Sequence, residues 1–225
     1  MNFSYTLHEV KPSIFLVEVE DSYDLSMLFC RVQEFYESPN PKYRNKDFCI
    51  WDFIDWYSRK NNGVFTYPSD WAGFNLPYDV MEKCIFGLSK IGFQSPYDQI
   101  MAQIYSEIRD TKSEGDAYVI GICANDETSL AHEICHGLYY TNPEYKKSAD
   151  SVTFEIKESQ PEIYNTLKRN LTTMGYAEGV IDDEIQAYLT VNDDNNNFGK
   201  GIDSKIKRKL HKQYVKALEK YFENK

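Results

Sequence analysis

Two of the four histidines in this sequence stand four residues apart, in the segment His132-Glu133-Ile134-Cys135-His136. On a helix, residues four apart lie on one face, so both imidazoles can share one metal ion through neutral ring nitrogens. Glu133 lies about 100° around that helix from His132, which leaves its carboxylate beside a metal rather than on it. The spacing therefore predicts a metal centre with His132 and His136 as ligands and Glu133 next to it.

The residues around this motif argue against a solvent-exposed pair of histidines. Leu130, Ile134, Cys135 and Leu138 make the predicted helix largely apolar, so we expect it to be buried. Buried imidazoles and a buried carboxylate are costly without partners, and one metal ion supplies a partner for both histidines. We expect Cys135 to be a small buried hydrophobic residue rather than a thiolate ligand.

The pattern His132-Glu133-x-x-His136, on a helix that follows a strand, resembles the zincin superfamily of zinc metallopeptidases. In that family the two histidines bind one zinc ion and the glutamate is the general base. Zinc lowers the pKa of its water to about 7. The resemblance implies a zinc-dependent hydrolase, a metallopeptidase that cleaves a peptide or protein substrate, with Glu133 activating the water. It also implies a compact zincin-like fold.

The third protein ligand distinguishes the branches of this superfamily. Metzincins place glycine at position 139 and histidine at position 142, but this sequence has Tyr139 and Asn142, which excludes that branch. The gluzincin branch takes a glutamate from a later helix, often with a small residue three positions further on. Glu184 and Ala187 match this pattern. The resemblance therefore assigns Glu184 as the third zinc ligand, with the small Ala187 allowing the two helices to approach.

Other carboxylates and one histidine compete for that role. Asp182 and Asp183 are rival ligands, although a shorter aspartate needs closer helices and the Gly-Thr-x-Asp pattern of the aspzincin branch is missing. His211 is a further competitor, but we expect it on the solvated face of the tail helix. Zinc-bound histidines usually donate their other N–H to a carboxylate or carbonyl. Asp183, Asp126 and Glu127 are candidates for that contact, and the sequence does not choose among them.

Peptide hydrolysis also needs a donor that stabilises the developing oxyanion, and several zincin branches use a tyrosine or histidine. Tyr188 lies one turn beyond Glu184 on the same helical face, so we select it. The other candidates are Tyr139, Tyr140 and Tyr145. Because the chain contains 18 tyrosines, we expect most of them to be packed in the interior.

Length and composition indicate a globular chain with an α+β fold. The sequence has 225 residues, of which 42% are hydrophobic and 15% aromatic, enough for a sizeable core. Predicted strands gather early and predicted helices late. We predict a single zincin-like domain over residues 1–225. Its N-terminal half (1–127) carries a small mixed sheet with helices, its C-terminal half (128–225) is helical, and the active-site helix lies between them.

Periodicity predicts the individual elements. The predicted strands are 13–20 and 117–124, with a short strand at 64–67. The predicted helices are 23–37, 48–57, 77–89, 96–112, 129–140, 161–174, 180–191 and 202–222. The segment 193–201 has the composition of a flexible loop.

Two further features allow either a functional or a structural interpretation. Phe65, Tyr67, Trp71 and Phe74 can line a substrate groove, but a core for the N-terminal half is the favoured interpretation. The strand at 117–124 can run along a cleft and pair with an extended peptide, as zincins do. The alternative is an ordinary central strand.

Charge and cysteine content exclude several classes of protein. The net charge of −10 makes nucleic acid a poor partner. The tail 201–225 carries a local charge of +5, for which docking on the acidic remainder of the chain is the simplest role. There is no apolar run long enough to span a membrane and no basic, apolar signal sequence at the start. Five cysteines without CxxC spacing favour a reducing cytoplasm over disulfides or a thiolate zinc site.

Two rival functions remain open at this point. The first is a non-catalytic interaction protein that keeps a zincin fold with a structural or vestigial zinc ion. The second is a metal-dependent hydrolase that acts on a non-peptide amide. Zinc binding without turnover of diverse peptides would favour the first, and the identity of the products would reveal the second.

Overall fold

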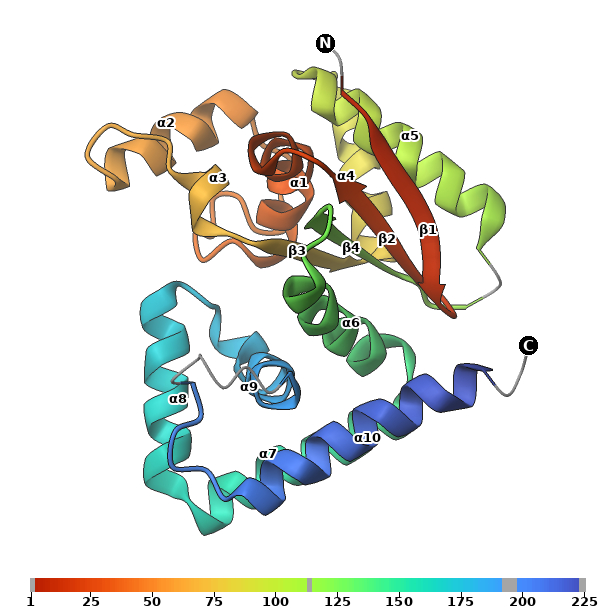
Figure 1. Cartoon of the computed structure of the whole chain (residues 1–225). Helices are drawn as coiled ribbons and strands as arrows, with labels where there is room; N and C mark the ends of the chain where they lie inside the picture. Colours follow the sequence, from red (N-terminus) through yellow and green to blue (C-terminus); the bar gives the residue numbers. More distant parts are fainter. Residues whose placement is uncertain (1–2, 113–114, 192–197, 223–225) are drawn as a thin grey trace. The chain divides into compact units, whose positions relative to one another are not determined.

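The fold is α+β, with one small mixed sheet and a majority of helices (Figure 1). The computed structural model describes residues 3–112, 115–191 and 198–222, with side chains up to residue 219. The predicted α+β class and the small mixed sheet in the N-terminal half are confirmed. The chain divides into two compact units, residues 1–129 and 130–225, and each is described by itself. Most of the predicted loop 193–201 lies outside the described residues.

The sheet belongs to the first unit and has the strand order β1-β2-β4-β3. Its strands are β1 (Tyr5–Lys11), β2 (Ile14–Val19), β3 (Gly73–Pro77) and β4 (Tyr118–Cys123). β1 and β2 form an antiparallel hairpin, β2 and β4 run parallel, and β3 is antiparallel to β4. The sheet is therefore mixed, with β1 and β3 at its edges.

The two strands with the strongest sequence signals are present, as β2 and β4. β4 pairs with β2 on one side and β3 on the other, so both of its edges are already used. The expectation that an extended peptide pairs with this strand is therefore wrong, and the ordinary central strand is correct. The short strand predicted at 64–67 is also wrong. Residues Tyr67–Asp70 form a short helix, α3, and the strand begins later, at Gly73.

The described part of the first unit contains five complete helices. They are α1 (Ser22–Glu37), α2 (Ile50–Lys60), α3, α4 (Tyr78–Ile91) and α5 (Pro96–Thr111). α1 packs against β2, β3 and β4, and both α4 and α5 pack on α1 (Figure 1). α5 begins with a capping box, in which Ser95 and Asp98 satisfy each other's backbone N–H groups, and Pro96 fits its first turn.

The aromatic segment after α2 contributes to the core of this unit. Tyr67 is fully buried and Phe74 is 1% exposed, so the interpretation as core is confirmed for these two rings. Phe65 and Trp71 are half-buried and pack against the same cluster. Phe74 stacks on Phe29 of α1, with ring centroids 5.4 Å apart. These contacts join α1 to the sheet through large apolar surfaces.

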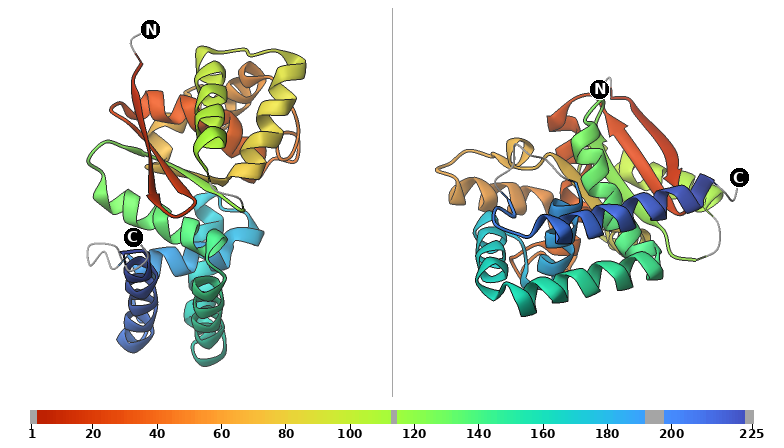
Figure 2. Two further views of the ribbon diagram at one scale, coloured as in Figure 1. Left: turned by 90° about the vertical axis from the view of Figure 1, so that its right-hand side faces the viewer. Right: turned by 60° about the horizontal axis from the view of Figure 1, so that its bottom comes forward.

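The second unit is helical. Its elements are most of α6 (Glu127–Thr141), α7 (Pro143–Ser159), α8 (Pro161–Met174), the short 3₁₀ helix η1 (Glu178–Val180), α9 (Ile181–Thr190) and α10 (Ser204–Phe222). α10 runs beside α7, as the views in Figure 2 also show, and it contacts α9. α8 ends at Gly175, whose φ of 106° suits glycine.

The sequence pattern did not predict α7. Asn142-Pro143 predicts the end of α6, and it also begins the next helix. The Asn142 side chain accepts hydrogen bonds from the backbone N–H groups of Glu144 and Tyr145, at 3.1 and 3.0 Å. Pro143 then occupies the first helical position, where no N–H is needed. One dipeptide therefore ends one helix and caps another.

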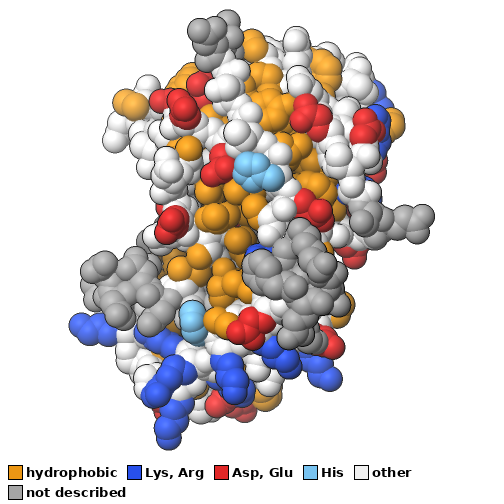
Figure 3. Space-filling view, turned by 45° about the vertical axis from the view of Figure 1, so that its right-hand side comes forward, with side chains coloured by type: hydrophobic (Ala, Val, Ile, Leu, Met, Phe, Trp, Pro, Cys, Tyr) orange, Lys and Arg blue, Asp and Glu red, His pale blue; other side chains and the backbone are white. Residues whose placement is uncertain are grey.

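The sequence of the tail helix α10 is rich in Lys and Arg, and Figure 3 shows basic side chains gathered at the lower end of one face of the molecule. Ile206 and Leu210 on the apolar side of α10 are buried, and the helix packs against α7 and α9. Lys209 Nζ lies 2.7 Å from Glu155 Oε2 of α7. This ion pair joins the tail to one acidic residue of α7. Among the helices that the structure describes, none is long and apolar enough to cross a membrane. All five cysteines are free.

Candidate metal centre

α6 presents both histidines of the motif from one face. Asp126 accepts a hydrogen bond from the backbone N–H of Ser129 at 3.0 Å and so caps the start of this helix. The apolar residues between and after the histidines are buried, as expected. His132 and His136 lie one turn apart, and their Nε2 atoms face each other at 3.1 Å. The local geometry of a helix thus places two imidazole nitrogens at one point.

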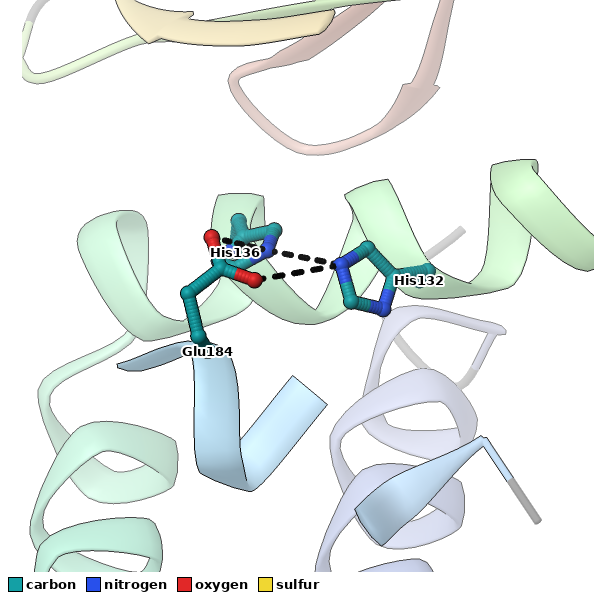
Figure 4. A group of neighbouring side chains, drawn as sticks. All are labelled: His132, His136 and Glu184. Carbon is teal, nitrogen blue, oxygen red and sulfur yellow. Dashed lines mark hydrogen bonds and ion pairs between the residues drawn. The ribbon is translucent and has the colours of Figure 1, made fainter. Parts of the chain in front are cut away.

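α9 brings Glu184 to the same point. Figure 4 shows its carboxylate reaching from α9 toward both imidazoles of α6. Glu184 Oε1 lies 3.5 Å from His136 Nε2, and Oε2 lies 3.6 Å from His132 Nε2. Ala187, one turn further along α9, is fully buried. The three residues assigned as ligands from the sequence are therefore brought together in space.

The separations within this group suit a small divalent cation. Zinc binds nitrogen and oxygen at about 2.0–2.1 Å, so neighbouring ligand atoms of a tetrahedral ion lie about 3.3–3.4 Å apart. The observed separations of 3.1, 3.5 and 3.6 Å are close to that spacing. Among the described residues, the buried Glu184 Oε2 has no hydrogen-bond partner. A cation between the three side chains would satisfy this oxygen, so the donor set fits zinc.

The electrostatic environment also favours a positive charge. Burial disfavours the charged form of His136, but Asp183, Glu184 and Glu133 together raise its pKa well above its ordinary value. Glu133 is itself buried, with an exposed fraction of 5%. The negative charges of Glu133 and Glu184 also raise the pKa of Tyr188, after the larger effect of burial. Several carboxylates thus surround two imidazoles, and a bound cation would balance them.

Asp183 contacts the second ring nitrogen of a predicted ligand histidine, a contact for which the sequence left three candidates. Its Oδ1 lies 3.0 Å from His136 Nδ1, whereas the Glu184 carboxylate lies near His136 Nε2. In a neutral His136, the contact with Asp183 would place the ring proton on Nδ1 and leave Nε2 as the nitrogen that can bind a metal. Asp126 instead bonds Ser129, and Glu127 is exposed at the start of α6. Of the three candidates, only Asp183 contacts a ligand histidine in the part of the chain that is described.

The rival ligands lie outside the group. Asp182 is paired with Lys157 and Tyr164, each at 2.7 Å. His211 Nδ1 lies 3.3 Å from the carbonyl oxygen of Thr190. Burial raises the pKa of the Cys135 thiol, which disfavours the thiolate that a metal would need. Asp183, as described above, faces the far nitrogen of His136.

Tyr188, one of the four candidate tyrosines, contacts a predicted ligand. Its ring lies against that of His132, with centroids 4.5 Å apart. Tyr139 donates a hydrogen bond to Asp150, and Tyr145 donates one to Gln186. Tyr140 is 38% exposed.

Two residues near the centre were missed by sequence reasoning. Tyr176 has its hydroxyl 3.2 Å from that of Tyr188, and burial, followed by the charge of Glu184, raises its pKa strongly. Gln186 is fully buried and donates to Asp183. No spacing distinguishes Tyr176 from the other tyrosines. Gln186 did have a signal in the sequence, because it is a polar residue within the Glu184–Ala187 turn, which is buried.

No family model, curated protein or solved structure matches this chain.

Proposed function

We propose that this protein is a zinc-dependent hydrolase, a metallopeptidase of the gluzincin type with a zincin-like fold. The observation that carries the proposal is the convergence of His132 Nε2, His136 Nε2 and the Glu184 carboxylate on one point. Three protein ligands that leave a position open are the arrangement of a catalytic rather than a structural zinc site. The buried Glu133, next to His132 in the chain, supports a hydrolytic role.

Each residue would have a separate task. A bound zinc ion would act as a Lewis acid and lower the pKa of water to about 7. Glu133 would accept a proton from the attacking water and deliver it to the leaving nitrogen. The Tyr188 hydroxyl would donate a hydrogen bond to the oxyanion that develops on the substrate carbonyl. Asp183 would hold His136 in the orientation that keeps Nε2 toward the metal.

Turnover of a peptide library by the zinc-loaded protein and by a Glu133→Gln variant tests the proposal. We expect the wild type to cleave peptides and the variant to lose about 10²–10⁴-fold in rate, because the general base is removed. Zinc content should stay equal in both, because Glu133 is not a ligand. Glu127→Gln, at an exposed position of the same helix, should behave as wild type.

The outcomes separate the competing functions. Full activity in the Glu133→Gln variant would contradict the assigned base. Stoichiometric zinc without cleavage of any peptide would favour the non-catalytic interaction protein. Hydrolysis of small amides in place of peptides would favour the metal-dependent hydrolase that acts on a non-peptide amide.

A further inference from the structure

A chain of hydrogen bonds leads from the candidate metal centre to α7, and its inner part is buried. Tyr145 Oη donates to Gln186 Oε1 at 2.8 Å, and Gln186 Nε2 donates to Asp183 Oδ1 at 2.8 Å. The same Asp183 oxygen lies 3.0 Å from His136 Nδ1. The contacts connect three helices: Tyr145 lies on α7, Gln186 and Asp183 on α9, and His136 on α6. Neither Tyr145 nor Gln186 belongs to the group of three candidate metal ligands.

We propose that Tyr145 and Gln186 are positioning residues, which set the metal affinity of the centre by fixing the Asp183 carboxylate against His136. This inference rests on the zinc site of the proposed function, but not on its peptidase activity.

The directions of the hydrogen bonds make this chain self-consistent. A carboxylate only accepts, so Gln186 must turn its amide nitrogen toward Asp183 and its oxygen toward Tyr145. Tyr145 must then donate. Burial, followed by the nearby Cys135, raises the pKa of Tyr145 well above its ordinary value, so its hydroxyl keeps the proton. Each member of the chain has one orientation that satisfies both neighbours.

Burial explains why Asp183 needs such support. Tyr145 is 3% exposed and Gln186 is fully buried, whereas the Asp183 side chain is 23% exposed. A partly exposed carboxylate can rotate toward water and leave the imidazole. The fixed amide of Gln186 holds Oδ1 in place, and Tyr145 in turn prevents that amide from flipping. Outer contacts of this kind typically change metal affinity 10–100-fold when removed.

The chain offers a matched control. Tyr164 also donates a hydrogen bond from its hydroxyl to an aspartate in the first turn of α9, in this case Asp182 at 2.7 Å. Asp182 lies outside the metal-ligand group. Tyr164→Phe therefore removes the same kind of bond, at the same end of α9, without touching the proposed positioning chain.

The test is the zinc dissociation constant, measured by competition with a chromophoric chelator. We expect about a 10-fold weaker zinc affinity in Tyr145→Phe and in Gln186→Met, and wild-type affinity in Tyr164→Phe. The double variant should be no weaker than the weaker single variant, because both changes break one chain. Thermal unfolding of the metal-free variants, which lose only polar contacts, verifies that each one folds. Unchanged affinity in Tyr145→Phe, or losses that multiply in the double variant, would overturn the inference.

A second measurement separates this inference from the proposed function. Nuclear magnetic resonance of the metal-free protein with ¹⁵N-labelled histidine reports how fast the His136 Nδ1 proton exchanges with water. We expect faster exchange in Tyr145→Phe and Gln186→Met than in wild type and Tyr164→Phe. A wild type that binds no zinc would refute the proposed function, while the exchange rates would still decide on the positioning chain. Equal exchange rates in all four proteins would refute the chain alone.

Discussion

The Nε2 atoms of His132 and His136 face each other at 3.1 Å from successive turns of α6. Two neutral imidazoles cannot both direct a lone pair at this distance without a proton or a cation between them. The Glu184 carboxylate closes the third side of the same point. Metal binding at this point is therefore the first property to test.

Zinc should stabilise the protein against unfolding. A ligand that binds only the folded state at 100 times its dissociation constant adds about 2.7 kcal/mol. We therefore expect a higher thermal midpoint with zinc than with a chelator in the wild type, and no such difference in His136→Ala. His211→Ala should retain the response, since that histidine lies outside the ligand group. Equal zinc stabilisation of His136→Ala would show that zinc binds elsewhere.

Removing the hydroxyl of Tyr188 should slow turnover and leave zinc in place. Loss of one oxyanion donor typically costs about 10²–10³ in kcat. We expect this loss in Tyr188→Phe, with an unchanged zinc dissociation constant. Tyr176→Phe should have a smaller effect, because Tyr176 acts through the 3.2 Å contact with Tyr188. Tyr139→Phe is the control, because its hydroxyl bonds Asp150. Wild-type kcat in Tyr188→Phe would remove this residue from the mechanism.

The first unit contains a buried carboxyl that should make stability depend on pH. Burial raises the pKa of Glu34 to about 7, although Ser38, Tyr67 and Lys60 partly oppose the effect. The folded state then holds a proton that the unfolded state releases near pH 4, so stability falls as pH rises between these values and stays low above 7. Ionisation of the buried Glu34 therefore lowers the free energy of unfolding by about 3 kcal/mol.

Glu34→Gln should remove this dependence. We expect wild type and variant to be similarly stable near pH 4, and the variant to be more stable at pH 8. Urea unfolding followed by tryptophan fluorescence measures this, because all three tryptophans lie in the first unit. Glu20→Gln, at an exposed position, should leave the pH profile unchanged. If Glu34→Gln increased the free energy of unfolding by the same amount at every pH, the assignment of the pH dependence to Glu34 would be contradicted.

Packing between α1 and the sheet depends on the absence of a side chain at Gly121. A Cβ at this position of β4 would lie 2.3 Å from the Phe29 ring, which is itself fully buried. Gly121→Ala should therefore destabilise the protein by about 1–3 kcal/mol, as overpacked cores do. In Gly179→Ala the new methyl group meets nothing within 4 Å, so this variant should be close to wild type. Equal unfolding midpoints for the two variants would contradict this description of the core.

Local patterns were sufficient to predict which three residues could form the metal centre. The spacing of His132 and His136 is a property of one helix turn, and Glu184 was reached through the resemblance to the gluzincin pattern. The strands β2 and β4 were predictable for a similar reason, because their continuous apolar runs require burial on both faces.

The features that were not predicted depend on tertiary contacts or on ambiguous signals. In β1, Tyr5 and Leu7 alternate with polar residues, but Glu9 interrupts the alternation, so the pattern is too short to identify a strand. α7 follows Asn142-Pro143, which fits the end of a helix as well as the start of one. The contact of Tyr145 with Gln186 spans 41 residues and forms only when α7 packs on α9. No local spacing encodes it.

X-ray absorption at the zinc edge, in the wild type and in Glu184→Ala, tests whether His132, His136 and Glu184 bind one zinc ion. We expect stoichiometric zinc in the wild type, with nitrogen and oxygen neighbours at about 2.0–2.1 Å and the outer-shell signal of two imidazoles. Glu184→Ala should lose most of its zinc, whereas Asp182→Ala should keep it. A wild type without zinc, a sulfur neighbour at about 2.3 Å, or an unchanged spectrum in Glu184→Ala would contradict the account.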